Sequence, residues 1–416
     1  MSLGDQGRSA RPGAPMKVLY VYDGHWPHNA TRVSKQVQAL LGAGHDVTIL
    51  SRGSAGRPCD EGDGRLTVTR LPFFRWRAAN RLVSYPVFMN PVWLRRIHRS
   101  AVRMKADCIV VRDLPLAPAA LMVGARLGVP VHYDMAEVYP VALHSMLPHE
   151  SGLALRVVRA TGAAGAIERW VVLRATSTFV VSEESRARCV KLGVPPSRVV
   201  LVGNTPANPE ALRKQWPAPT DILDLGARPI ALFVGNIFAD RGLRHAIDAM
   251  AIVARTIPDA MLVIIGDGRE RGRLEEQVAN QSLQANVRFL GWKHHDTHPA
   301  YLRHAQIGLL PFLATEHICI TLANKLFDYM GAALPVVASD VPPMRRVMEE
   351  TGSGFVSPAG DSGAMATLLV RLFQSAELRE RLGANGQKAI AGQYAWHNDA
   401  RRFVDAIQRG ATVGSR

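Results

Sequence analysis

The sequence predicts an α/β protein of two domains, each built on a parallel β-sheet. Three observations support this prediction. At roughly 150 residues per domain, a chain of 416 residues corresponds to two or three domains. Short apolar runs alternate with segments of helical spacing, as in parallel sheets whose strands are joined by helices. A proline-rich stretch, residues 205–228, interrupts this alternation, so we expect it to link the two domains.

The first domain is expected over residues 16–204. It follows a polar segment, 1–15, which lacks the apolar core of a signal peptide and which we expect to be a flexible tail. The apolar run 17–22 ends at Asp23, as a buried parallel strand would. By the same alternation we expect helices at 31–41 and 117–127, and further strands at 45–50, 107–112, 129–133, 177–182 and 199–202.

The second domain is expected over residues 229–395. Its strands are expected at 230–235, 260–265, 287–290, 307–311 and 335–338, and its helices at 243–254, 301–305 and 324–330. Residues 396–416 are expected to form a helix that packs back on the first domain. Open parallel sheets bind ligands at the carboxyl ends of their strands, so we expect the two domains to face a central cleft that holds the chemistry.

Composition excludes several classes of protein. Hydrophobic residues make up 47% and charged residues 20% of the chain, which excludes a disordered, collagen-like or coiled-coil protein. No apolar run reaches the roughly 18 residues of a membrane-spanning helix. The four cysteines lie far apart, so neither a disulfide framework nor a structural zinc site is indicated. The cytoplasm is therefore the predicted location.

The net charge of +15 favours anionic partners: nucleotides, phospholipid surfaces or nucleic acid. Ten lysines and arginines and no acidic residue fall within residues 64–106. The aromatic residues interleaved with them are Phe73, Phe74, Trp76, Tyr85, Phe88 and Trp93. Such a segment suits the inner face of an anionic membrane, with nucleic acid the less favoured partner. The alternative is that the aromatic side chains are core residues and the arginines ordinary surface residues.

Two glycine-containing turns could approach a phosphorylated ligand. Gly235 and Asn236 end an apolar strand, and Arg241 opens the helix that follows. The free N–H groups of a helix start attract phosphate, and a guanidinium adds charge-assisted contacts. Gly266 ends the next strand, where glycine allows a ligand close to the backbone. The alternatives are a solvated arginine in an ordinary turn and an ordinary strand–helix connection.

Lys325 and Asp328 are three residues apart and share a face of the expected helix. The carboxylate could accept hydrogen bonds from a ribose diol, and the lysine could contact phosphate. The alternative is a surface ion pair worth a few tenths of a kcal/mol.

At this point the chain resembles a known family. The two-domain layout, the Arg241-Gly242 pair and the string NKLFDYMGAALPVVAS at 324–339 are similar to family 4 (group 1) retaining glycosyltransferases of the GT-B fold. The resemblance runs from residue 16 to the end, and it is strongest to a subgroup that acts on lipid-linked or cell-surface glycans. It implies transfer of a hexosyl or N-acetylhexosaminyl group from a UDP- or GDP-type sugar to an acceptor hydroxyl, with retention.

The resemblance also implies where the ligands bind: the donor mainly in the second domain, the acceptor mainly in the first. Arg241 matches the basic residue that meets the donor diphosphate, and Asp328 the acidic residue, usually Glu, that holds the ribose. Asn324 and Lys325 match positions that the donor approaches. We therefore expect catalysis by Arg241 and Lys325, assisted from the first domain by Glu137, which follows a strand end and could contact the acceptor or simply be a solvated carboxylate.

The chain departs from the family pattern at three positions. Asn236 stands where many members have Arg, and Ile320 where many have an acidic residue that Glu316, nearby, could replace. The glycine pair after the first strand is reduced to Gly24. Trp292 follows a strand end and could stack on the nucleobase or pack in the core. We expect Gly24, Glu316 and Trp292 to contribute to the donor site.

No DxD sequence occurs in the chain, so no divalent metal or other cofactor is needed to explain stabilisation of the leaving group. Two other functions stay open. One is a nucleotide-sugar epimerase or hydrolase of the same fold. The other is a non-catalytic protein that binds a membrane or nucleic acid.

Overall fold

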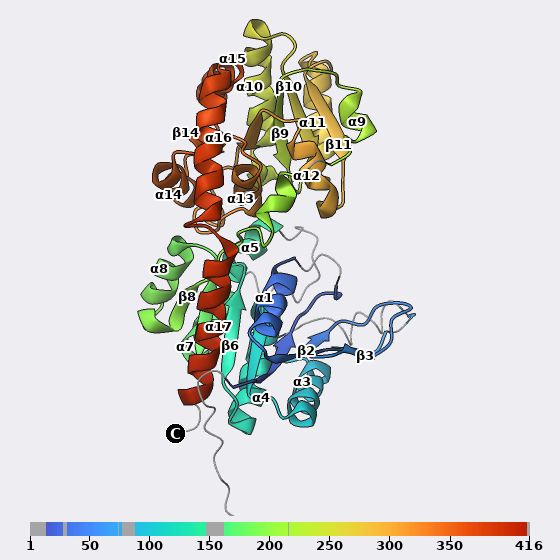
Figure 1. Ribbon diagram of the computed structural model, residues 1–416, viewed down its shortest axis with the longest axis vertical. Coiled ribbons are helices and arrows are strands. Elements are labelled where there is room, and N and C mark those ends of the chain that lie inside the picture. The colour runs from blue at the N-terminus through green and yellow to red at the C-terminus, as the bar shows by residue number, and fades with distance from the viewer. Residues whose placement is uncertain are drawn as a thin grey trace, which may run out of the picture. The chain divides into compact units, whose positions relative to one another are not determined.

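The computed structural model describes residues 14–27, 31–73, 75–76, 88–146, 162–214 and 216–413. Contacts divide the chain into two compact units. The first comprises the described residues up to Gly203 together with those from His397 onward, and the second comprises Asn204–Trp396. Each unit is a β-sheet with helices packed against it (Figure 1). The prediction of two parallel-sheet α/β domains is confirmed.

In the described part of the first unit, eight strands form one sheet in the order β3-β4-β2-β1-β5-β6-β7-β8. The strands are β1 (Lys17–Val21), β2 (Asp46–Ser51), β3 (Asp60–Asp63), β4 (Leu66–Arg70), β5 (Cys108–Arg112), β6 (Val131–Met135), β7 (Ser177–Val180) and β8 (Val199–Leu201). The helices are α1 (Thr31–Gly42), α3 (Pro91–Met104), α4 (Ala117–Leu127), α5 (Tyr139–Met146), α7 (Ala163–Arg174), α8 (Glu183–Lys191) and α17 (Trp396–Val413). All pairs are parallel except β3–β4, which is antiparallel.

The second unit, within its described residues, has six parallel strands in the order β11-β10-β9-β12-β13-β14. The strands are β9 (Ile230–Val234), β10 (Met261–Ile265), β11 (Val287–Gly291), β12 (Ile307–Leu310), β13 (Val336–Ser339) and β14 (Gly354–Ser357). The helices are α9 (Thr220–Leu223), α10 (Leu243–Thr256), α11 (Arg271–Asn280), α12 (His298–Leu302), α13 (Asn324–Gly331), α14 (Pro342–Thr351), α15 (Ser362–Gln374) and α16 (Ala376–Ala391). In chain order this is 3-2-1-4-5-6, the order of doubly wound nucleotide-binding sheets.

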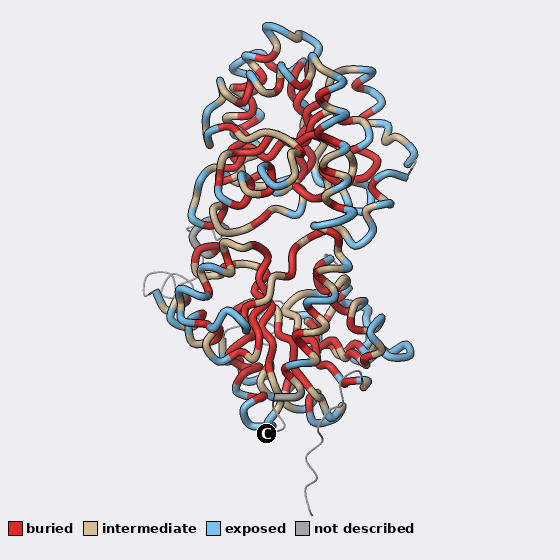
Figure 2. Tube along the Cα trace, turned by 60° about the vertical axis from the view of Figure 1, so that its left-hand side comes forward, coloured by how far each residue is buried: buried red, intermediate tan, exposed pale blue. Residues whose placement is uncertain are grey.

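The core of each unit follows its central strands, which are buried along their length (Figure 2). β9 and β10 are buried at every position, because helices cover both faces of a parallel sheet. Gly308 in β12 leaves room for the ring of Tyr329, since a Cβ at residue 308 would lie 2.4 Å from that ring. This close contact seats α13 on the sheet.

The proline-rich segment 205–228, expected as a linker, packs on the second unit. Leu212, Ile222 and Leu225 are buried in its core. Asp221 accepts a hydrogen bond from the Tyr301 hydroxyl at 3.0 Å and lies 2.7 Å from the Lys293 ammonium. The packing therefore assigns the segment to the second unit, although its prolines hide any periodicity.

The last helix, α17, belongs to the first unit except for its first residue, Trp396. Its Phe403 ring lies 4.8 Å from that of Phe179 in β7, and Arg402 Nε donates to the Leu201 carbonyl at 2.9 Å. These contacts add a helix from the far end of the chain to the first sheet.

The basic aromatic segment 64–106 is partly regular structure, since it contains β4 and α3. Trp93 of α3 is fully buried, so the idea that its ring lies on a membrane-facing surface is wrong. Phe73 and Trp76 are exposed, Trp76 by 81%, whereas Phe74 and Tyr85 lie outside the described residues. Among the described helices, none has the length and apolar composition needed to cross a bilayer.

Candidate active site

The β9–α10 connection sets the geometry of the candidate site. Gly235 and exposed Asn236 follow β9, a short 3-10 turn spans Ala239–Arg241, and Gly242 caps the N-terminus of α10. Gly242 has φ +64°, and a Cβ there would lie 1.8 Å from the Pro311 carbonyl oxygen. Glycine is therefore required for this connection to lie against the end of β12.

Arg241 is held against the loop that follows β12. Its guanidinium carbon lies 4.8 Å above the Phe312 ring, and its side chain is only 15% exposed. Its Nε is 3.6 Å from Asp240 Oδ1, which is beyond hydrogen-bonding distance. His317 of the same loop is buried, and burial together with the charge of Arg241 lowers the pKa of its imidazole. A neutral imidazole leaves Arg241 as the cation at this point.

Helix α13 is anchored to the end of β9. The Tyr329 hydroxyl lies 3.0 Å from the Val234 N–H, which donates to it directly before Gly235. The anchor places Lys325 and Asp328, both half-buried, on a helix that meets the same strand end as the Arg241 connection. The predicted donor site has two parts, the connection that carries Arg241 and helix α13. They follow β9 and β12, which are neighbours in the sheet.

Lys325, Asp328 and His298 form one polar group. Lys325 Nζ lies 2.8 Å from Asp328 Oδ2 and 3.0 Å from His298 Nδ1. Burial, and then the charge of Lys325, lower the pKa of His298 to about 4. At neutral pH the imidazole is therefore uncharged, and its Nδ1 accepts a hydrogen bond from the Lys325 ammonium. The ring also forms a hydrogen bond with the backbone of Lys293. The lysine is oriented from two sides.

Two family models match the chain. The model "Glycosyl transferases group 1" matches residues 221–389, and "Glycosyl transferase 4-like domain" matches residues 30–205. Both describe glycosyltransferases; the first model lies within the second unit, and the second model covers the first unit and ends two residues into the second.

The chain belongs to the group 1 glycosyltransferases.

Curated relatives are similar over different lengths. The chain is 28% identical to alpha-D-kanosaminyltransferase of Streptomyces kanamyceticus over 55% of this chain and 59% of that protein. It is 35% identical to phosphatidyl-myo-inositol mannosyltransferase of Mycobacterium leprae, over 44% of this chain and 48% of that protein. It is 26% identical to 2-deoxystreptamine glucosyltransferase of Streptomyces kanamyceticus, over 89% and 95%. The match thus spans about half the length of the first two relatives and nearly all of the third.

Solved structures show the fold. Sucrose-phosphate synthase from Thermosynechococcus elongatus superposes with a TM-score of 0.73 at 17% identity, over 94% of this chain and 98% of that one. Anabaena HepE, solved in complex with UDP, gives 0.68 at 14% identity, over 94% and 99%. At these identities the likeness shows the fold alone, and that fold is GT-B.

Other residues predicted to bind the donor of this glycosyltransferase follow strands β10, β11 and β12 of the same sheet. Gly266 follows β10 with φ +144°, and a Cβ there would lie 1.8 Å from the Gly235 carbonyl oxygen. Trp292 follows β11 and is 61% exposed, so it is a surface residue. Glu316 and Asn324 are exposed in the loop after β12 and at the start of α13.

Gly24 and Glu137 belong to the first unit. A Cβ on Gly24 would lie 2.2 Å from the Tyr22 side chain, so this glycine makes room for a tyrosine. Glu137 is half-buried, two residues beyond the end of β6. Their roles at a donor or acceptor stay predictions.

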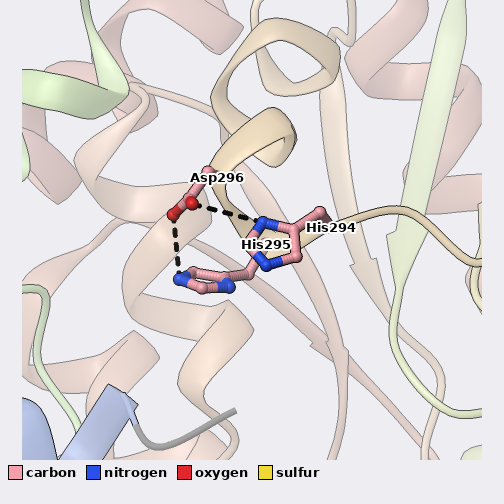
Figure 3. A group of neighbouring side chains, drawn as sticks. All are labelled: His294, His295 and Asp296. Carbon is pink, nitrogen blue, oxygen red and sulfur yellow. Dashed lines mark ion pairs between the residues drawn. The ribbon is translucent and has the colours of Figure 1, made fainter. Parts of the chain in front are cut away.

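Figure 3 shows the group of described side chains that could hold a metal ion: His294, His295 and Asp296. Their ligand atoms lie within 4.8 Å of one another, and all three residues are exposed. Asp296 is shared by two imidazoles, at 3.2 Å from His294 Nδ1 and 2.9 Å from His295 Nε2. The arrangement is that of exposed ion pairs, which form when the imidazoles are protonated.

Sequence reasoning missed His298, Phe312 and His317. None of them stands at a motif spacing. His298 contacts Lys325 and Phe312 contacts Arg241, whereas His317 is affected by the charge of Arg241. The Pro311-Phe312 pair directly after an apolar strand was the one usable signal, because side chains at a strand's carboxyl end lie next to the ligand edge.

Proposed function

We propose that this group 1 glycosyltransferase moves a hexosyl or N-acetylhexosaminyl group from a nucleotide-diphosphate sugar to an acceptor hydroxyl. The observation that supports this most is the placement of Arg241 at the start of α10, beside the end of β9 to which α13 is anchored. The carboxyl edge of the second unit's sheet then carries the Arg241 guanidinium, the N–H groups at the start of α10 and the Lys325–Asp328 pair.

Each residue has a distinct task in this proposal. The first-turn N–H groups of α10 and the Arg241 guanidinium bind the diphosphate, with Lys325 as a second cation. Asp328 accepts hydrogen bonds from the ribose diol, and Trp292 stacks on the base. As the sugar–oxygen bond breaks, negative charge grows on the diphosphate. Preorganised cations and N–H groups stabilise that charge, which is commonly the largest catalytic contribution.

The donor is proposed to be a UDP sugar, with GDP sugars the next candidates. HepE was solved with UDP, and the curated relatives are named as glucosyl, mannosyl and kanosaminyl transferases. Retention of the anomeric configuration is proposed because the resemblance to family 4 implies it. The proposed acceptor is a hydroxyl of a glycan or lipid-linked saccharide.

Nucleotide release measured with and without an acceptor tests the activity. Purified protein is first screened for thermal stabilisation by UDP and GDP sugars, since a ligand at 100 times its Kd adds about 2.7 kcal/mol. With the best donor, we expect free nucleotide and a larger glycan only when saccharide acceptors are supplied. Conversion of donor alone would instead indicate an epimerase or hydrolase, and binding without turnover a non-catalytic protein.

We further propose that transfer needs no divalent metal, because Arg241, Lys325 and main-chain N–H groups supply the positive charge. The same assay is expected to give an unchanged rate in EDTA. A rate that falls in EDTA and returns with Mn²⁺ or Zn²⁺ would contradict this, and His295→Ala would then show whether the group in Figure 3 is responsible.

The location proposed is the cytoplasm, with peripheral contact to an anionic membrane. A groove of about 350 Å³ lies between α3 and α4, with Arg95, Arg99 and Arg126 around Leu94 and Met122. We expect co-sedimentation with anionic liposomes that weakens as salt rises, because each basic residue near the surface contributes about 1 kcal/mol. Arg95→Glu with Arg99→Glu should weaken it, whereas Arg255→Glu on the second unit should not. No sedimentation at low salt would contradict the membrane proposal.

A further inference from the structure

The connection that follows β11 carries three neighbouring side chains that can bind a metal ion, and the proposed transfer assigns a task to none of them. They are His294, His295 and Asp296, and both imidazoles turn toward the one carboxylate (Figure 3). His294 Nδ1 lies 3.2 Å from Asp296 Oδ2, and His295 Nε2 lies 2.9 Å from Asp296 Oδ1. Each carboxylate oxygen therefore faces one ring nitrogen, and either a proton or a metal ion has to join the two.

The spacing of these atoms fits a tetrahedral zinc ion. Zinc binds imidazole nitrogen at about 2.0–2.1 Å and carboxylate oxygen at about 2.0–2.2 Å, so neighbouring ligand atoms at tetrahedral angles are about 3.3 Å apart. The two nitrogen–oxygen separations, 3.2 Å and 2.9 Å, are close to this value. One ligand atom from each residue lies within 4.8 Å of the others. Because all three residues are exposed, rotation of their side chains is enough to close the remaining separation.

The backbone under the three ligands is ordered by its own hydrogen bonds. His295–Thr297 form a 3-10 turn, and the Thr297 N–H donates to the His294 carbonyl at 2.9 Å. The Thr297 hydroxyl donates to the same oxygen at 2.7 Å. Ligands on a backbone that is already ordered bind an ion at a lower entropic cost.

No lysine or arginine competes with an ion for Asp296. Among the described residues, the ion pairs of this carboxylate are with the two imidazoles alone. The nearest lysine in the chain, Lys293, is directed to Asp221, whose carboxylate lies 2.7 Å from its ammonium. In a chain with a net charge of +15, Asp296 thus stays available to a cation.

The ligand set indicates which metal ion fits. Imidazole nitrogen suits zinc and its neighbours among the transition metals, whereas magnesium and calcium prefer sites made of oxygen. His298 adds no fourth ligand, because its Nδ1 accepts from Lys325 at 3.0 Å and its ring also bonds the Lys293 backbone. Three protein ligands that face solvent leave the fourth position of a zinc ion to water.

We propose that His294, His295 and Asp296 form a binding site for one zinc ion. The ion takes the place of the protons between the imidazoles and the carboxylate, and it ties the three side chains together. The His294 ring packs edge to face with Trp292, with ring centres 6.0 Å apart, so the ion also restrains the turn beside that tryptophan. It takes no part in the proposed transfer, so the inference does not rest on the proposed function.

Titration of the protein with ZnCl2, measured by calorimetry after EDTA treatment and dialysis, tests the site. The parent is expected to bind one zinc ion per chain. Asp296→Asn keeps the shape of the side chain but removes its charge, and His295→Ala removes one nitrogen. Each is expected to weaken zinc affinity at least about tenfold, because losing a residue that merely supports a metal ligand already costs about 10- to 100-fold.

Two control variants remove other groups that zinc can bind. His397→Ala removes an exposed histidine at the start of α17, and Cys59→Ser removes an exposed thiol. Both should bind zinc as the parent does, and a tenfold excess of MgCl2 should leave the zinc titration unchanged.

Three results would overturn the zinc site. They are a parent protein that binds no zinc, an Asp296→Asn or His295→Ala protein with the parental Tm and the parental zinc affinity, and a site that Cys59→Ser or His397→Ala abolishes. The titration contains no donor sugar, so its outcome is separate from that of the transfer assay.

Discussion

Replacing Arg241 by alanine is expected to lower kcat by about 10²- to 10³-fold, the usual effect of removing one group that stabilises a developing oxyanion. The side chain is fixed over Phe312 and is 15% exposed, so it is in place before the donor binds. Steady-state kinetics with the best donor sugar measures the loss.

Two further variants sharpen that result. Arg241→Lys keeps the positive charge but loses the planar guanidinium, which can donate two hydrogen bonds to one phosphate. We therefore expect only partial recovery of kcat. Arg255→Ala removes an exposed arginine from the last turn of α10, at the far end from Arg241, and should retain the parental rate. An Arg241→Ala protein with the parental Tm and the parental kcat would refute the diphosphate role of this residue.

Asp328→Ala is expected to weaken UDP binding by about 10- to 100-fold, the range for losing hydrogen bonds to a charged acceptor. Lys325 keeps a partner in this variant, because His298 Nδ1 lies 3.0 Å from its ammonium. The loss therefore reports the contact of Asp328 with the ligand and not an unpaired lysine. Isothermal titration calorimetry gives the Kd of UDP for the parent protein and for Asp328→Ala.

A ligand lacking the ribose hydroxyls makes the test specific. In the parent, 2′,3′-dideoxy-UDP should bind more weakly than UDP, whereas Asp328→Ala should bind the two equally, as in a double-mutant cycle. Asp224→Ala, an exposed acidic residue elsewhere in the second unit, is the control and should not change either Kd. If Asp328→Ala still discriminates the two nucleotides as the parent does, the ribose assignment is wrong.

Local pattern was enough to predict most of the elements that form the ligand edges. The apolar runs of β1, β9 and β10 stand out because parallel strands are buried on both faces, and α1 stands out by the helical spacing of its apolar residues. The apolar positions Trp93, Ile97 and Ala101 of α3 also lie four apart, but its four arginines favoured the interpretation as a binding surface. A helix can bury one face and remain strongly basic on the other.

The parts that could not be predicted depend on contacts between distant loops. Nothing near His298 in the sequence indicates that it accepts a hydrogen bond from Lys325, and nothing near Phe312 indicates that it lies under Arg241. Asp113, directly after β5, has φ 65° and ψ 153°, and this conformation is hidden for a different reason. Backbone strain exists only where the surrounding fold imposes it, so a single aspartate after a strand carries no sign of it.

A crystal structure of the protein with UDP tests the central claim most directly. The account predicts that the diphosphate contacts Arg241 and the N-terminus of α10, and that a ribose hydroxyl lies within hydrogen-bonding distance of Asp328. UDP bound elsewhere, with Arg241 and Asp328 both out of contact, would contradict it.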